Sequence, residues 1–115
     1  MNDDRELLEA AARAAGIEVV SQGDDFWIAE DGIPIKHWSP LRDDGDALRL
    51  AVKLRLSIDY APHDVGPYVR AWRPGAEMMY APVSELEDFH AADGDPLAAT
   101  RRAIVRAAAE IGRAS

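Results

Sequence analysis

The chain contains no cysteine among its 115 residues. Disulfide bonds, a thiolate nucleophile and cysteine-ligated zinc are therefore excluded, and the composition suits a reducing compartment. The sequence also lacks an apolar run long enough to span a membrane. These absences predict a cytoplasmic protein without a membrane partner.

Common catalytic and phosphate-binding motifs are missing as well. The sequence has no G-x-S-x-G, no glycine-rich phosphate loop and no H-x-x-x-H pair. Because His37, His63 and His90 are scattered, a metal site would have to be assembled from distant residues. We therefore predict that the protein is not an enzyme and that it uses no metal and no cofactor.

Basic residues are the minority charge, with 13 Lys and Arg against 21 Asp and Glu, for a net charge of −8. Proteins that bind duplex DNA present a basic face to the phosphates, so this balance argues against a duplex nucleic acid partner. The acidic residues gather at predicted turns and helix starts, whereas the bases gather on two predicted helices and one predicted strand. A local cationic site for a small anion is compatible with this distribution.

The length predicts a single domain, residues 1–115, with one hydrophobic core. We expect this core to form around a helix at 44–54. Pro40 ends an extended element before it, and the acidic run 43–46 supplies acceptors for the first N–H groups of the helix. From residue 47 to 54 only Arg49 and Lys53 are polar, so the helix should be buried on its other sides.

The same acidic run raises the alternative of a calcium loop. Its glycine, Gly45, falls between the second and third acids, and no glutamate follows at the distance that an EF-hand requires. Helix capping by Asp43, Asp44 and Asp46 is therefore the better prediction.

The remaining elements follow from hydrophobic periodicity and turn residues. In the segment 56–60, Leu56, Ile58 and Tyr60 should share one face of a strand, with Ser57 and Asp59 on the other. The alanine-rich segments 10–15 and 107–109 offer close-packing surfaces, and we expect a homo-oligomer. The predicted elements are a helix at 3–15 ended by Gly16, strands at 17–21 and 26–29, an edge piece at 33–35 containing Pro34, the helix at 44–54, strands at 56–60, 68–72 and 77–81, an irregular acidic segment at 82–95, and a helix from Pro96 to Gly112 capped by Asp95.

In the order α-β-β-α-β-β-β-α, helices do not alternate regularly with buried parallel strands. This order predicts an α+β fold, with a mainly antiparallel sheet covered by helices.

Three separate predicted elements contribute cationic side chains, and these form the predicted binding site. Guanidinium groups bind phosphate bidentately, and Trp and Tyr rings stack on bases. A helix N-terminus would add free N–H groups for an anion. The predicted ligand-binding residues are Arg49 and Lys53 on the helix at 44–54, Tyr68, Arg70 and Trp72 on a strand, Arg101, Arg102 and Arg106 on the last helix, and Trp38.

A purely structural role is the alternative for these residues. Arg102 and Arg106 can pair with Glu110 along one exposed helix face, which contributes a few tenths of a kcal/mol for each pair. The aromatic rings would then fill the core.

The segment W-x-P-L-x-D-D-G-D-A-L-R-L-A-V-K-L at 38–54 resembles a signature of small accessory proteins of phages and prophages of Gram-negative bacteria. The segment A-T-R-R-A-I-V-R-A-A-A-E-I-G at 99–112 is similar to the second half of that signature. Those proteins resemble the phage α-β-α sandwich group. The resemblance implies a phage gene, among whose neighbours inhibitors of host immunity are frequent, and it implies no particular reaction.

Three functions follow as hypotheses. In the first, a phage protein in the host cytoplasm sequesters a nucleotide-derived immune signal without catalysis, and a small homo-oligomer buries this anionic ligand between subunits. In the second, acidic segments mimic nucleic acid and occupy a basic site on a host protein. The third is a structural or assembly role in the virion. The acidic segments of the second hypothesis are Asp24-Asp25, Glu30-Asp31, and Glu85, Glu87 and Asp88.

Overall fold

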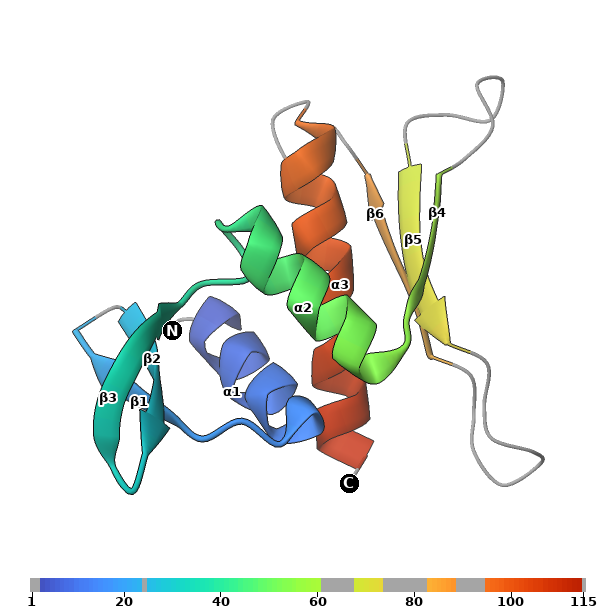
Figure 1. Ribbon diagram of the computed structural model, residues 1–115. Helices are drawn as coiled ribbons and strands as arrows, with labels where there is room; N and C mark the ends of the chain where they lie inside the picture. Colours follow the sequence, from blue (N-terminus) through green and yellow to red (C-terminus); the bar gives the residue numbers. More distant parts are fainter. Residues whose placement is uncertain (1–2, 24, 61–67, 74–82, 89–94, 115) are drawn as a thin grey trace.

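The computed structural model describes residues 3–23, 25–60, 68–73, 83–88 and 95–114. Its helices form a central layer, with one antiparallel sheet, β1-β2-β3, on one side and a second, β4-β5-β6, on the other (Figure 1). The elements are α1 (Asp3–Ala15), β1 (Val19–Gln22), β2 (Asp25–Glu30), β3 (Ile33–Trp38), α2 (Asp44–Leu54), β4 (Ser57–Tyr60), β5 (Tyr68–Arg73), β6 (Val83–Asp88) and α3 (Pro96–Ala114).

The predicted α+β class and antiparallel pairing are confirmed, but the single sheet is wrong, because the strands form two separate sheets. The order is α-β-β-β-α-β-β-β-α. The piece predicted at 33–35 is part of the longer strand β3, and its Pro34 lies on an edge strand as predicted. The strand β6 falls within 82–95, which was predicted to be irregular. The strand predicted at 77–81 lies outside the described residues.

Helices α1 and α3 pack closely through small side chains (Figure 1). The alanines at 10–12, 15 and 107–109 are at most 3% exposed. At Gly112 the two backbones approach so closely that an added Cβ would overlap the carbonyl oxygen of Ala10. These alanines therefore pack within the chain and do not supply the surface on which the oligomer prediction depended. Self-association itself stays a prediction.

Helix α2 begins as predicted. The N-cap Asp43 has extended backbone angles, and its Oδ2 accepts a hydrogen bond from the backbone N–H of Asp46 at 2.8 Å. The expected burial on all sides but one is wrong, since Leu48 is 60% and Val52 is 68% exposed. The helix packs against α3 and α1, and this leaves its outer side open.

The sheet β1-β2-β3 is attached to the core by two aromatic side chains. Phe26 and Trp38 are register partners on β2 and β3, and they are 5% and 3% exposed. The outer strand β3 carries Pro34, Lys36 and a register shift opposite Ile28, all of which disfavour pairing with a further strand.

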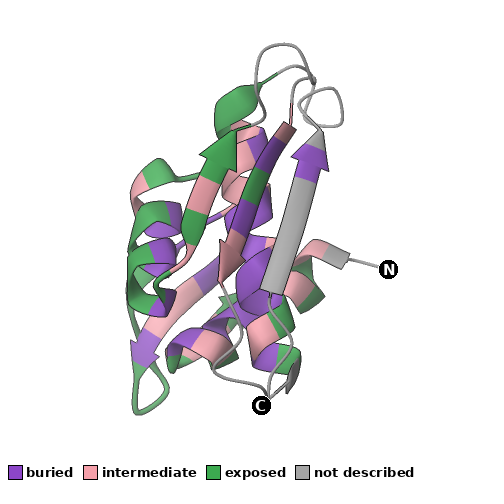
Figure 2. Ribbon diagram, turned by 90° about the vertical axis from the view of Figure 1, so that its right-hand side faces the viewer, coloured by how far each residue is buried: buried purple, intermediate pink, exposed green. Residues whose placement is uncertain are grey.

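The second sheet covers α3 with one face only. Val69 and Ala71 on β5 are fully buried, whereas Arg70 between them is exposed, as the alternating colours of β5 in Figure 2 show. On β4, Ile58 packs against the core and the hydroxyl of Tyr60 lies 2.8 Å from that of Thr100 on α3. The alternation predicted for 56–60 is confirmed. Within the described residues, no helix has the length and apolarity needed to cross a bilayer.

Candidate functional site

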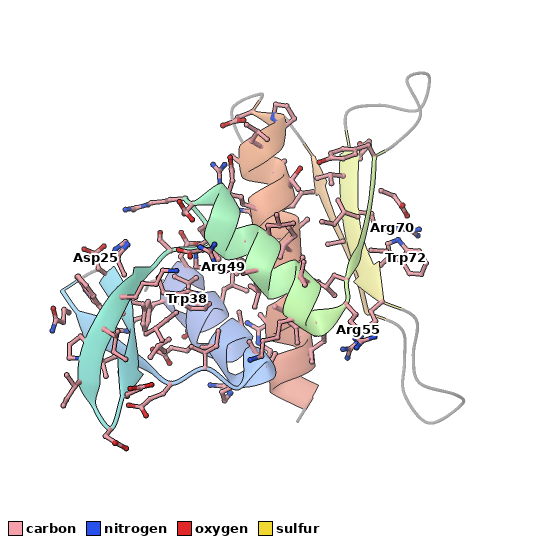
Figure 3. All side chains as sticks on the ribbon, in the orientation of Figure 1. Asp25, Trp38, Arg49, Arg55, Arg70 and Trp72 are labelled. Carbon is pink, nitrogen blue, oxygen red and sulfur yellow. The ribbon has the colours of Figure 1, made fainter. Side chains whose placement is uncertain are left out.

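Three of the predicted ligand-binding residues lie on the outer face of β5. Tyr68, Arg70 and Trp72 are two residues apart, so a strand projects them to the same side. Figure 3 shows Arg70 and Trp72 pointing away from the helical layer. We call these three residues the β5 face, which combines two aromatic rings with a guanidinium between them.

Asp59 on β4 holds two side chains of the β5 face in place. It is the register partner of Arg70, and its Oδ2 accepts hydrogen bonds from Arg70 Nη2 at 3.0 Å and from Trp72 Nε1 at 2.5 Å. The Arg70 guanidinium lies 4.8 Å from the centroid of the Trp72 ring, within cation–π distance. The hydrogen bonds from Arg70 and then from Trp72 lower the pKa of Asp59. The carboxylate is therefore ionised at neutral pH and orients both neighbours.

A second cation, Arg55, lies beyond the Trp72 end of the β5 face. It is the C-cap of α2, with φ 57° and ψ 44°, and it comes two residues before Ser57, the register partner of Trp72. Its side chain is exposed and makes no hydrogen bond or ion pair within the described part of the chain. Figure 3 shows it at the end of α2 that leads into β4.

Arg49 and Arg101, by contrast, stabilise the start of α2. Arg49 Nη2 donates to Oδ1 of the buried Asp46 at 2.7 Å, while Oδ2 of the same carboxylate accepts from the Ser39 N–H at 2.9 Å. Arg101 Nε donates to the carbonyl of Leu41 at 2.9 Å, and its Nη1 donates to Asp44 at 2.6 Å. Arg49 thus binds the acidic run at 43–46, and Arg101 binds both this run and the Leu41 carbonyl just before it.

The other α3 arginines point to two further elements. Arg102 Nη2 donates to Asp4 on α1 at 3.3 Å, and Arg106 Nη1 donates to Glu87 on β6 at 3.1 Å. The alternative in which both pair with Glu110 is wrong, because Glu110 pairs with Arg113. The side chains of Arg102 and Arg106 thus reach carboxylates on the packed neighbours α1 and β6, whereas Arg113 pairs within α3.

Trp38 and Lys53 lie apart from the β5 face. The Trp38 side chain fills the core beside Phe26, and it also lines a cavity next to α1. Lys53 is exposed on α2, with no ion pair among the residues that the structure describes. The predicted set therefore divides, and Tyr68, Arg70 and Trp72 are its members on the β5 face.

Helix N-termini add nothing to the β5 face. At α2 the N-cap Asp43 and the acidic side chains of the first turn occupy the position that an anion would take. At α3 the Asp95 Oδ1 accepts from the N–H of Leu97 at 3.0 Å, which confirms the predicted cap.

No cluster of metal-ligating side chains occurs among the described residues. His37 Nε2 lies 3.6 Å from Asp25 Oδ1, and its ring meets Trp27 edge-on, with centroids 5.5 Å apart. His63 and His90 lie outside the described residues.

The acidic segments of the nucleic-acid-mimic hypothesis have different environments. Glu30 and Asp31 are exposed at the β2–β3 turn. Glu87 is 8% exposed and paired with Arg106, so it does not contribute to an acidic surface.

Sequence reasoning missed Asp59 and Arg55 as members of a site. Asp59 was predicted to lie on the polar face of its strand, but its place beside Arg70 depends on the β4–β5 register. Nothing local marks Arg55, whose position depends on where α2 ends relative to the sheet.

No family model matches the chain, and no curated protein or solved structure matches it either. The resemblance of residues 38–54 and 99–112 to phage accessory proteins therefore stays a prediction.

Proposed function

We propose that this protein binds a small nucleotide-type anion on the β5 face, without catalysis, and thereby sequesters a nucleotide-derived signal of host antiviral defence. The observation that carries the binding proposal is the arrangement of Trp72, Arg70 and Asp59. An indole and a guanidinium are stacked at 4.8 Å and held by one carboxylate on a solvent-facing sheet.

A nucleobase has two flat faces, and such faces stack on aromatic rings and on guanidinium planes. Tyr68 and the Arg70–Trp72 pair offer both kinds of surface on one strand. Because Asp59 fixes the indole through its N–H, the ring loses little further freedom when a base binds. Base–aromatic stacking contributes about 1–3 kcal/mol per base.

The phosphate of such a ligand requires a cation that is not already neutralised. Arg70 forms an ion pair with Asp59, which neutralises its charge. The Arg55 side chain has no partner in the described chain, and it lies toward the Trp72 end of the sheet. We assign Arg55 to the phosphate and Arg70 to the base. This division places one charged contact and one stacking contact on neighbouring elements.

The groups of the β5 face support binding without chemistry. The pKa of Asp59 is lowered by two hydrogen-bond donors, so its carboxylate stays ionised near neutral pH, and a guanidinium stays protonated there. These groups orient a ligand rather than transfer protons to it. The antiviral part of the proposal rests on the resemblance of residues 38–54 and 99–112 to phage proteins.

Isothermal titration with AMP, ADP-ribose and cyclic di-AMP tests the binding proposal. We expect at least one of these nucleotides to bind. We expect W72A to lower the affinity for that nucleotide by about tenfold or more, as the loss of one stacking contact predicts. R55Q should weaken it as well. The matched control is R13Q, which removes an exposed α1 arginine that makes no ion pair within the described residues.

Absence of binding heat for all three nucleotides with the wild-type protein would contradict the proposal. Equal affinity of W72A and the wild type would contradict the assignment to the β5 face. For the antiviral part, expression of the wild-type protein should restore phage growth in a host whose defence uses the bound nucleotide, whereas W72A should not.

A further inference from the structure

A cavity of about 280 Å³ lies between α1, the start of β2 and the segment that joins β3 to α2. Leu8, Phe26, Trp38 and Leu41 give it apolar walls. Its size falls near the lower end of the range for small-molecule sites, about 300–1,000 Å³, and suits a ligand with a single ring. None of the residues of the β5 face lines it.

Two carboxylates and two guanidiniums line this cavity, and they differ in their partners. Asp4 already binds Arg102 at 3.3 Å, and Asp25 lies 3.6 Å from His37, so each carboxylate has a basic neighbour. Arg42 also lines the cavity, and its guanidinium makes no hydrogen bond or ion pair with any described residue.

Arg5 adds a second guanidinium. It stacks over the Phe26 ring at 5.5 Å and pairs with Glu9 at 3.3 Å. The cavity therefore combines a guanidinium that has no described partner, that of Arg42, with a wall of four apolar side chains, and this combination suits an organic anion.

We propose that this cavity is a second binding site, which takes a small aromatic anion with one carboxylate or phosphate group. Arg42 binds the charged group bidentately, since carboxylate and phosphate both match the guanidinium geometry. The ring of the ligand lies against Leu8, Phe26 and Trp38. This site is independent of the β5 face, and either can exist without the other.

Titration of the ¹⁵N-labelled protein with benzoate and with phenyl phosphate, followed by NMR, tests the proposal. We expect saturable shifts of the Trp38 indole N–H and of the Ser39, Leu41 and Arg42 amides with at least one probe. R42Q should weaken that binding by about tenfold, the loss expected for one charge-assisted contact. Because Arg42 is exposed and its side chain has no described partner, R42Q should fold normally.

K53Q is the matched control, since Lys53 is likewise exposed and unpaired in the described chain but does not line the cavity. It should bind both probes as the wild type does. The proposal is overturned if neither probe gives saturable shifts at the cavity, or if R42Q binds as tightly as the wild type. Shifts confined to residues 68–72 would also overturn it, because they would assign the anion to the β5 face.

Discussion

The indole N–H of Trp72 donates a hydrogen bond to the carboxylate of Asp59 on the neighbouring strand. The same carboxylate oxygen accepts from Arg70, which stacks over the indole ring. A half-buried tryptophan is thus fixed from two sides on the outer face of the sheet. Arg70 is paired within the protein, as Arg101, Arg102 and Arg106 are, but its carboxylate partner also binds an indole N–H.

The pKa of Asp59 should lie below the ordinary aspartate value of about 3.9. The hydrogen bond from Arg70 is the largest cause, so R70Q should raise this pKa. Because the folded pKa is the lower one, ionised Asp59 stabilises the fold above the unfolded pKa, and this contribution is lost as the pH falls through the folded pKa. A carboxyl ¹³C NMR titration measures the pKa of Asp59 in the folded wild type and in folded R70Q. Equal pKa values in the two proteins would contradict the prediction.

Replacement of Gly112 by alanine should destabilise the α1–α3 contact. The new Cβ would overlap the Ala10 carbonyl, and relief of this overlap costs about 1–3 kcal/mol of unfolding free energy. G45A is the control. The nearest atoms to its added Cβ include the end of the Arg49 side chain at 3.2 Å, and this flexible end can move away. The effect of G45A should stay within about 1 kcal/mol. Urea denaturation compares the two, and equal stabilities would show that the helices are not in close contact there.

Loss of the Asp46 carboxylate should weaken the start of α2. D46A removes the acceptor of both the Ser39 N–H and Arg49, and we expect it to lower the free energy of unfolding by about 2–3 kcal/mol. E110A breaks another i,i+3 pair with arginine, but its side chain is 48% exposed and the loss should stay below about 1 kcal/mol. Thermal or urea unfolding distinguishes the variants. A loss from E110A as large as that from D46A would contradict the buried role of Asp46.

The Arg106–Glu87 pair should couple α3 to β6. Glu87 is largely buried, so a double-mutant cycle of R106Q and E87Q should give a coupling of about 1–3 kcal/mol. The cycle of R102Q and D4N is the reference, since its side chains are 40% and 49% exposed. Its coupling should be below about 1 kcal/mol. A smaller coupling for Arg106–Glu87 than for this exposed pair would contradict the packing of the second sheet on α3.

Local chemistry was sufficient to predict the helices. The bounds predicted for α2 agree with the structure, because the cap at Asp43 and the apolar periodicity are properties of adjacent residues. The start of α3 was likewise marked by Asp95-Pro96.

The two-sheet arrangement was not predictable in this way. Which strands pair depends on contacts between distant segments, and the helices turned out to separate the two sets of strands. β6 was missed because Glu85, Glu87 and Asp88 lower its strand propensity. The structure accommodates one of these acids by pairing Glu87 with Arg106 on α3.

The candidate site was predictable only in part for the same reason. Alternation along β5 suffices to place Tyr68, Arg70 and Trp72 together. The role of Asp59 required the register of a second strand. The α3 arginines were equally plausible ligands by residue type, and only their carboxylate partners on α1, α2 and β6 show that they bind within the protein.

Titration of the ¹⁵N-labelled protein with AMP, ADP-ribose and cyclic di-AMP, followed at the tryptophan indole N–H signals, tests the central claim most directly. We predict a saturable shift of the Trp72 signal with at least one of these nucleotides, while the Trp27 and Trp38 signals stay unchanged. A Trp72 signal that none of the three nucleotides moves would contradict nucleotide binding on the β5 face.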